Sequence, residues 1–325
     1  MSVGRFARAL ARVLPAAAAC AIIAGTASPR AAERAEITFP GERPYPESIT
    51  ATSDGTLIAG SLNEGGVFRV PPGSSVAERW IAPGANDSMT ILGVYADEKG
   101  GTLWACSTNL GAFGVPPPGG AKPIALKAFD LKSGAAKGSW PLPGDKSLCN
   151  DMVVGTDGTV YVADLFQPHV LALRPGGKAL EVWAESPLFN GEGPQLDGIT
   201  IAGDGNMYVN PYAGGKLFRI EMKDGAAGKV TELKLSQPID HPDGMRPFGA
   251  KDLLMTEGGG NFDVVRLEGD AAKVEVVRDK FKGPCAVVQT GDTAWVLEGQ
   301  QNTLFKKDGG KPTTFKAFAV SLPSH

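Results

Sequence analysis

The sequence predicts an all-β protein built from six similar units of four antiparallel strands each. First, an Asp-Gly pair separates two short apolar runs between Asn150 and Asp164, which is a strong β-hairpin signal because Gly adopts positive φ at little cost. Second, this arrangement recurs along the chain at intervals mostly in the forties. Third, Gly (43) and Pro (25) are frequent, and no long stretch has apolar residues at helical spacing. Together these observations predict a six-bladed β-propeller.

The first 32 residues have the layout of a secretory signal peptide. Arg5, Arg8 and Arg12 precede a short Ala-rich apolar segment at 13–24, and candidate cleavage points among small residues follow between 27 and 32. The apolar segment is too short to span a bilayer, for which ~20 residues are needed. We therefore expect an exported protein, periplasmic or secreted.

The remaining residues, 33–325, are expected to form a single propeller domain. Loss of the four Arg of the leader leaves 28 basic residues against 35 acidic ones, so the formal charge moves from −3 to −7. An acidic surface argues against nucleic acid or an anionic membrane as a partner. We expect a small-molecule partner, no nucleic acid, and no membrane contact once the leader is removed. The oligomeric state is left open, with a monomer as the default.

The cysteines give a weaker signal. Cys20 leaves with the leader, and Cys106, Cys149 and Cys285 remain, an odd number without the spacing of a metal site. One disulfide and one free thiol would suit an oxidising compartment, but we favour three buried thiols.

Six positions align when the units are superimposed on a residue followed by a small residue or Asp and then an aliphatic residue or Met. They are Glu47, Leu92, Asn150, Asp197, Asp243 and Cys285. Each unit continues with further β-like runs. Third runs lie at 66–70, 170–173, 217–220 and 264–267, and fourth runs at 77–81, 180–183, 230–233 and 274–277. Four runs per unit correspond to the four strands of a blade.

Two segments interrupt the repeat, and one segment precedes it. Residues 111–122, with their Pro-Pro-Pro-Gly-Gly sequence, and residues 189–195 are predicted to be loops on the rim. Residues 35–39 are a candidate outer strand for the last blade, which would hide a sheet edge.

The aligned residues should meet, because the first strand of each blade lines the central channel. Three of them are carboxylates and one is an amide, and no Lys or Arg shares their position. Like charges in a narrow mouth repel one another unless they are protonated or bridged by a cation. Oxygen donors favour a hard cation, above all Ca²⁺, and the absence of His and Cys pairs argues against zinc.

A simpler explanation applies to some of the acidic residues, because Asp or Asn before a hairpin can cap its own turn. Asp54, Asp157 and Asp204 precede Gly and are fully explained as turn formers. Four oxygen acceptors in the same register of four units are less well explained in this way. We therefore favour the cation site for them.

Four motifs resemble the regucalcin and gluconolactonase family of six-bladed propellers, which includes senescence marker protein and luciferin-regenerating-enzyme-like members. The motifs are Pro46-Glu47, Cys149-Asn150-Asp151, Leu196-Asp197-Gly198 and Pro242-Asp243-Gly244-Met245, within a similarity that extends over about 46–320. The family binds a divalent cation at the channel through a Glu of the first blade and Asn and Asp of later blades. The resemblance implies that Glu47, Asp197 and Asp243 hold the metal and that Asn150 contacts metal or substrate.

Two positions depart from the family pattern. Asp197 stands where the family usually has Asn, which makes the site more acidic. Leu148 stands where the sugar-lactone hydrolases often carry Arg, which weakens the prediction of a sugar acid lactone as the substrate.

The chemistry that the resemblance implies is hydrolysis of a lactone or related ester. Ca²⁺, or another hard divalent cation, would polarise the carbonyl while a carboxylate takes a proton from water. Asp243 and Asn150 are the candidate catalytic residues, with Asp243 as base, and His241 on the same rim is an alternative. Candidates for substrate contact or support of the site end the second strands: Asp164, Asn210, Glu257 and Glu298.

A second class of function is a non-catalytic propeller that binds a small ligand or a protein, with the metal structural or absent. Leu92 and Leu148 favour this alternative, because neither can contribute to catalysis. Asn150, Asp243 and His241 favour the hydrolase.

Overall fold

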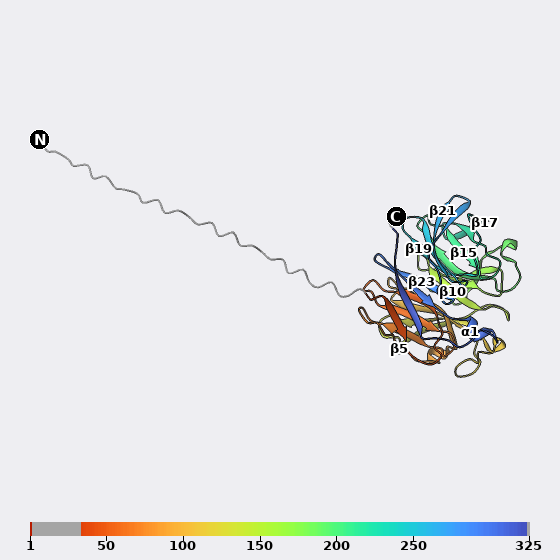
Figure 1. Ribbon diagram of the computed structural model, residues 1–325. Helices are drawn as coiled ribbons and strands as arrows, with labels where there is room; N and C mark the ends of the chain where they lie inside the picture. Colours follow the sequence, from red (N-terminus) through yellow and green to blue (C-terminus); the bar gives the residue numbers. More distant parts are fainter. Residues whose placement is uncertain (2–33, 324–325) are drawn as a thin grey trace. The chain divides into compact units, whose positions relative to one another are not determined.

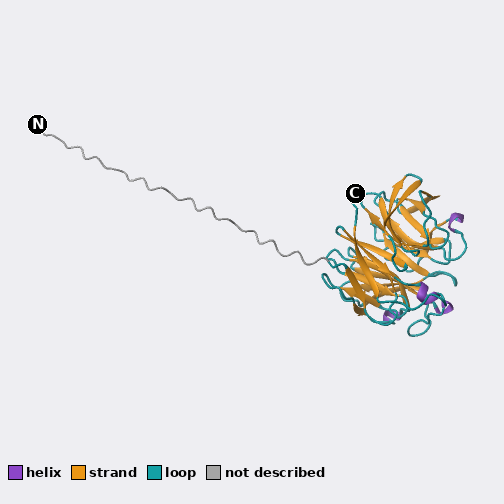
Figure 2. Ribbon diagram, in the orientation of Figure 1, coloured by secondary structure: helices purple, strands orange, loops and turns teal. Residues whose placement is uncertain are grey.

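Six antiparallel sheets make up the part of the chain that the computed structural model describes, Met1 and residues 34–323 (Figure 1). Strands dominate, and helices are limited to η1 (Ala85–Asp87), η2 (Gly111–Phe113), η3 (Pro187–Phe189) and α1 (Asn302–Phe305) among the described residues (Figure 2). The predicted six-bladed propeller with four antiparallel strands per blade is confirmed. The predicted signal peptide, apart from Met1, lies outside the described residues.

Each sheet is one blade, and its first strand lies nearest the central channel. The first three blades are β2 (Pro46–Ala51), β3 (Leu57–Ser61), β4 (Val67–Val70), β5 (Glu78–Ile81); β6 (Thr90–Asp97), β7 (Thr102–Thr108), β8 (Ala125–Asp130), β9 (Ala136–Pro141); and β10 (Cys149–Val154), β11 (Val160–Asp164), β12 (His169–Leu173), β13 (Glu181–Glu185). The others are β14 (Leu196–Ile201), β15 (Met207–Pro211), β16 (Phe218–Lys223), β17 (Ala226–Glu232); β19 (Pro242–Phe248), β20 (Asp252–Glu257), β21 (Asn261–Glu268), β22 (Ala271–Arg278); and β23 (Pro284–Thr290), β24 (Thr293–Glu298), β25 (Phe315–Ser321), β1 (Glu36–Phe39).

The first and last strands of the chain close the ring. β1 pairs antiparallel with β25, with Ile37 opposite Ala317, so the N-terminal strand is the outer strand of the sixth blade. The expected role of residues 35–39 is thereby confirmed, and it covers the edge of β25. The fifth blade carries an addition that the sequence did not predict, the two-residue β18 (Lys234–Leu235), which pairs parallel with β22.

The Asp-Gly turns form as predicted. Asp157 Oδ1 accepts a hydrogen bond from the backbone N–H of Thr159 at 3.0 Å, and Gly158 has φ 86°. Asp54 and Asp204 accept equivalent bonds from the residue two positions on, both at 2.9 Å. These three carboxylates are turn formers, as the sequence indicated.

The innermost strands approach one another closely around the channel, where β2, β6, β10, β14, β19 and β23 each contact the next in a closed ring. Small residues make this approach feasible. A Cβ on Gly198 would lie 2.2 Å from the carbonyl oxygen of Asp243, and a Cβ on Gly244 would lie 2.7 Å from that of Cys285. The glycines that follow Asp197 and Asp243 are therefore required by the packing of neighbouring blades.

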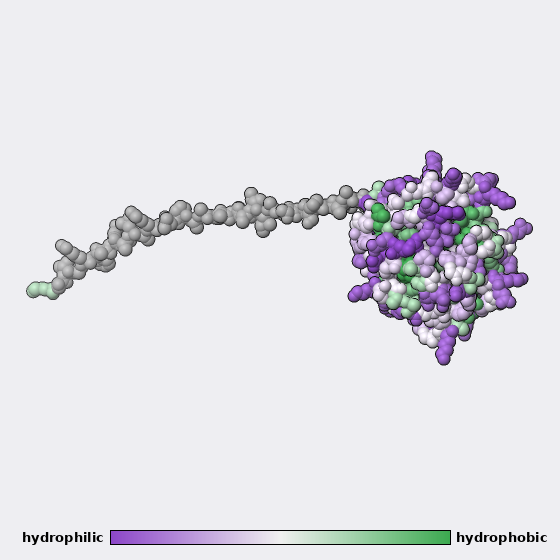
Figure 3. Space-filling view, turned by 90° about the horizontal axis from the view of Figure 1, so that it is seen from below, coloured by the Kyte–Doolittle hydropathy of each residue, from purple (hydrophilic) through white to green (hydrophobic). Residues whose placement is uncertain are grey.

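The core lies between blades, so strands near the centre are buried on both faces. β3, β11 and β15 are buried at every position, whereas the outer strands β9 and β17 are largely exposed. The face in Figure 3 carries mostly hydrophilic side chains, with hydrophobic ones in small scattered areas. No helix among the described residues is long and apolar enough to cross a membrane.

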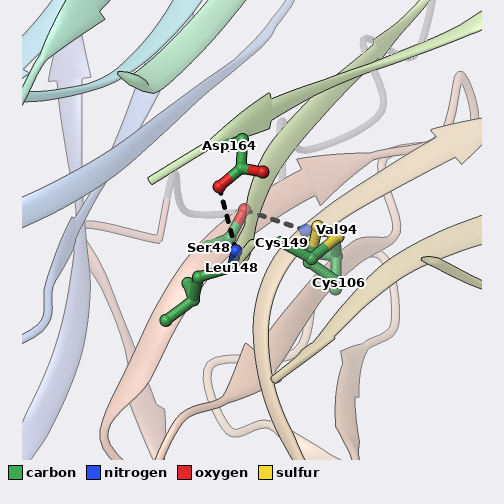
Figure 4. Close-up of a disulfide and its surroundings, with 6 residues drawn as sticks. All are labelled: Ser48, Val94, Cys106, Leu148, Cys149 and Asp164. Atoms are coloured by element: carbon green, nitrogen blue, oxygen red, sulfur yellow. Dashed lines mark hydrogen bonds between the residues drawn. A yellow bond between two sulfur atoms is a disulfide. The ribbon is translucent and has the colours of Figure 1, made fainter. Parts of the chain in front are cut away.

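A disulfide joins Cys106 on β7 to Cys149 on β10, and Cys285 is the buried free thiol (Figure 4). The prediction of three buried thiols is therefore wrong. The two cysteines lie 43 residues apart, about one repeat, and β7 packs against β10 of the next blade. A one-repeat spacing thus places both sulfur atoms at the same interface, which a search for metal-site spacings does not detect.

Candidate metal and substrate site

Six side chains, one from each innermost strand, meet at one mouth of the channel. Each is the second or third residue of its strand, and none is more than 6% exposed. The pairing register between the first and second strands of every blade shifts near this point. Such an irregularity releases a side chain from the regular ladder and redirects it. The aligned positions are therefore collected by the fold as the sequence predicted.

Five of the six line the floor of a cavity of about 240 Å³, namely Leu92 and four side chains that carry oxygen. These four are Glu47, Asn150, Asp197 and Asp243. Asn150 Nδ2 donates a hydrogen bond to Asp197 Oδ1 at 2.7 Å, which links the third blade to the fourth. Cys285 lies outside this cavity, with Sγ 3.7 Å from the carbonyl oxygen of Pro46.

Burial disfavours the ionisation of all three carboxyl groups at once. Burial first, and then the charges of Asp197 and Glu47, raise the pKa of Asp243 well above its usual range. Burial, and then the charges of Asp197 and Asp151, raise the pKa of Glu47 well above its usual range. Burial raises the pKa of Asp197 to about 7, although the hydrogen bonds with Asp243 and Asn150 oppose the shift. The floor therefore attracts either protons or a cation.

A cation that the alignment did not include lies beneath the carboxylates. Arg246, three residues beyond Asp243 on β19, is 7% exposed, and its Nη1 donates to Asp151 Oδ2 at 2.9 Å. Both residues line a space of about 10 Å³ below the floor, enough for about one water molecule. No Lys or Arg shares the aligned position, but Arg246 pairs with Asp151 close by, and its charge partly offsets the rise in the pKa of Glu47. The alignment compared one position per strand and so passed over it.

The residues that end the second strands support the backbone around the site, and none of them lines the 240 Å³ cavity. Asn210 Oδ1 accepts from the N–H of Gly198 at 2.9 Å, and its Nδ2 donates to the carbonyl of Asp243 at 2.9 Å. The others accept from the backbone N–H before or at the start of the inner strand: Asp164 from Leu148, Glu257 from Asp240 and Glu298 from Lys282. The structure thus places all four behind the floor.

The histidines lie away from the floor. His241 has a left-handed backbone (φ 55°), and its Nδ1 lies 2.5 Å from Asp240 Oδ1 on an exposed part of the rim. Its ring packs 5.1 Å from that of Tyr212, and Tyr212 does line the cavity. His169 bonds Asp164 at 3.1 Å, and His325 lies outside the described residues.

The floor fits a hard divalent cation by donor type and by charge. Every donor is a carboxylate or amide oxygen, and four buried carboxylates face one guanidinium, which leaves a surplus of negative charge. Within residues 34–323, no three His, Cys, Asp or Glu side chains are already drawn together as a metal-binding group. The fit is therefore one of chemistry and charge rather than of a preformed cage.

The walls above the floor are apolar, which the sequence analysis did not predict. Eight of the sixteen residues that line the cavity are apolar, and they come mainly from loops after second strands. Phe113 lies in the predicted 111–122 loop and Leu110 just before it, and Leu165 and Phe166 follow β11. Phe113, an aromatic residue inside the predicted rim loop, was the one sequence signal of this wall. The repeat does not show where such a loop lies in the fold.

No protein-family model matches the chain, and a search of curated proteins finds no match. Solved structures do match. A gluconolactonase from Xanthomonas campestris is similar at 14% identity, over 89% of this chain and 89% of that one, with a TM-score of 0.62. A catalytically inactive virginiamycin B lyase from Staphylococcus aureus, solved with quinupristin, is similar at 17% identity, over 87% and 83%, with a TM-score of 0.61.

A third similar structure is the PQQ-bound aldose sugar dehydrogenase from Streptomyces coelicolor, at 16% identity, over 89% of this chain and 97% of that one, with a TM-score of 0.58. At these identities the similarity shows the fold alone. The resemblance to gluconolactonases is confirmed at that level, and a lyase and a dehydrogenase share the architecture. The fold does not by itself select one of these chemistries.

Proposed function

We propose that the protein is an exported hydrolase of lactones or related esters that works with a hard divalent cation, Ca²⁺ in the first place. One observation carries the proposal: four oxygen-bearing side chains from four strands converge on the floor of a cavity large enough for a small molecule. The surplus of negative charge at this floor supports the cation, and the fold shared with gluconolactonases supports the reaction class.

Glu47, Asn150, Asp197 and Asp243 are the residues that would hold the cation. When bound, such a cation polarises the substrate carbonyl and stabilises the charge that develops on its oxygen. Arg246 pairs with Asp151 below the floor, so this carboxylate already has a cationic partner and is not among the proposed ligands.

Asp243 is the proposed base. A general base must lie within hydrogen-bond reach of the water whose proton it takes, and the Asp243 side chain lines the cavity floor where that water and the substrate carbonyl would lie. Asp243 removes a proton from water, whose oxygen bonds to the carbonyl carbon. The ring C–O bond then breaks, the proton passes to the departing oxygen, and the product is a hydroxy acid.

The disulfide supports export. Disulfides persist in oxidising compartments and are rare in the cytosol, and the Cys106–Cys149 bridge is fully buried between two blades. The bridge and the leader-like residues 1–32 are independent features that favour the same location.

The test combines thermal melts in EDTA and in Ca²⁺ with a panel of lactones and aryl esters followed by pH-stat. A ligand at 100 times its dissociation constant adds about 2.7 kcal/mol to the free energy of unfolding, which is a visible shift. Stabilisation by Ca²⁺ together with EDTA-sensitive hydrolysis supports the proposal. Hydrolysis that EDTA leaves unchanged would contradict a role for the cation, and absence of hydrolysis would contradict the proposal of an enzyme.

The alternative is a non-catalytic propeller that binds a small ligand. The exposed position of His241 favours it, because no histidine of residues 34–323 lines the floor as a candidate base. Ligand-induced stabilisation without turnover of any lactone or ester would establish this alternative.

A further inference from the structure

Above its polar floor, the cavity presents apolar side chains on several sides. Leu62 comes from the first blade, Leu110 and Phe113 from the second, and Leu165 and Phe166 from the third. Phe305 of α1 contributes from the segment that follows β24. Side chains from distant parts of the chain thus form one apolar wall.

Two of these side chains are unusually exposed for their type. Phe113 is 49% exposed and Phe305 is 41% exposed, and they are the only exposed phenylalanines among the described residues. Phe113 also packs against Phe166, with ring centroids 5.7 Å apart. Exposed apolar side chains that gather at one cavity mark a binding surface rather than random surface composition.

The walls offer little to a polyhydroxylated substrate. A sugar ring needs a hydrogen-bond partner for nearly every hydroxyl, and unpaired hydroxyls are costly when they are buried. The polar side chains above the floor are Tyr212, Gln301, Asn302 and Lys306, three of which belong to one segment beside α1. The sides formed by the first three blades carry no polar side chain above Glu47 and Asn150 among the described residues.

We infer that the substrate is a lactone or ester with an alkyl or aryl substituent, its carbonyl at the polar floor and its substituent against the Phe113–Phe166 wall. This inference rests on the proposed function and names its substrate class. The volume of about 240 Å³ equals that of about eight water molecules, which suits a monocyclic lactone with a short chain.

The test compares kcat/KM for δ-valerolactone, δ-hexalactone, δ-octalactone and δ-decalactone with that for glucono-δ-lactone. Burial of each added methylene should raise kcat/KM by about fourfold until the wall is covered. Phe113→Ala and Phe166→Ala should each lower kcat/KM for δ-decalactone at least tenfold more than they lower that for δ-valerolactone. Leu188→Ala is the matched control, since Leu188 is 41% exposed and does not line the cavity.

A binding measurement separates this inference from the proposed function. The lactam analogues of δ-decalactone and δ-valerolactone resist hydrolysis, and their effect on the melting temperature reports binding alone. Preference for glucono-δ-lactone overturns the inference and leaves the hydrolase standing. Without any hydrolysis, stabilisation by the long-chain lactam that Phe113→Ala abolishes overturns the hydrolase and supports the apolar ligand class. Equal effects of the two lactams, with no hydrolysis, overturn both.

Discussion

Asp243 combines three constraints that no other residue of the floor combines. Its carboxyl group is 4% exposed, its pKa is raised by burial and by Asp197 and Glu47, and its backbone carbonyl accepts a hydrogen bond from Asn210. The backbone bond fixes where the residue stands, and the surroundings of the carboxyl group determine what it can do. A substitution that preserves shape can therefore test the charge alone.

Asp243→Asn should abolish stabilisation by Ca²⁺ and lower lactone hydrolysis at least 100-fold, because the variant lacks both the donor charge and the base. The fold without cation should stay intact, since the change also removes a like-charge repulsion. Melts with and without Ca²⁺, together with pH-stat rates, measure both effects. Asp204→Asn is the control, a turn carboxylate that should leave both unchanged. Normal hydrolysis by Asp243→Asn would show that the site is misplaced.

Asn210 holds two inner strands together, although it does not touch the cavity. It bonds the N–H of Gly198 and the carbonyl of Asp243, and it is fully buried. Asn210→Ala should lower the free energy of unfolding by about 2–4 kcal/mol, because it leaves two buried backbone groups unpaired. Urea denaturation measures the loss. Asn190→Ala, at an exposed position after η3, should cost well under 1 kcal/mol, and equal losses in the two variants would contradict the bridging role.

At this scale, sequence reasoning located residues that repeat and missed those that do not. Glu47, Asn150, Asp197 and Asp243 share a register, so one alignment finds them all. Arg246 has no counterpart in the other blades, and only the structure shows that it reaches Asp151 from two blades away. A single unrepeated contact leaves no periodic trace in a sequence.

The first and second strands of a blade form one working element, in which a register shift presents the site residue and the end of the second strand supports it. The shift lies between Leu196 and Ile199 in the fourth blade and between Pro242 and Met245 in the fifth. The predicted hairpins were correct because Asp-Gly turns are local signals. The shifts were not predicted, and they lie where the inner strand approaches the backbone of the neighbouring blade, a contact between residues distant in the sequence.

β21 carries a buried carboxylate that should make stability depend on pH. Asp263 is fully buried, and among the described residues neither of its oxygens has a hydrogen-bond partner. Burial first, and then the neighbouring Glu257, raise its pKa to about 9. Between about pH 4 and pH 9 the folded state keeps a proton that the unfolded chain loses. The free energy of unfolding should therefore fall as pH rises through that window.

Asp263→Asn should remove this contribution, since the amide is neutral at every pH. The variant should match the wild type near pH 4 and exceed it in stability by a margin that grows toward pH 9. Urea midpoints taken at several pH values provide the measurement. Asp270→Asn on the exposed turn before β22 is the control and should keep the wild-type slope. A parallel slope in Asp263→Asn would assign the pH dependence to other groups.

For the whole molecule, the repeat was enough to predict the number of blades, and the closing strand was a candidate on other grounds, but the contents of the rim were not predicted. Ring closure follows from a general rule, because a free edge must be covered and residues 35–39 precede the first blade. The apolar wall depends on the positions of Phe113 and Phe305, which follow irregular segments of the chain. Irregular backbone follows tertiary contacts, so composition alone predicted a loop there and nothing about its role.

The Cys106–Cys149 bridge is the only disulfide between blades among the described residues, and it should contribute to global stability. It closes a 43-residue separation between Cys106 and Cys149, which the chain-entropy estimate equates with about 4 kcal/mol. Reduction under denaturing conditions followed by refolding in reductant should lower the urea midpoint accordingly. A Cys106→Ala/Cys149→Ala variant should be less stable and indifferent to reductant, whereas Cys285→Ala should retain the full response. If the oxidised wild type and the double variant unfold at the same urea concentration, the ring owes its stability to blade packing and β1 pairing alone.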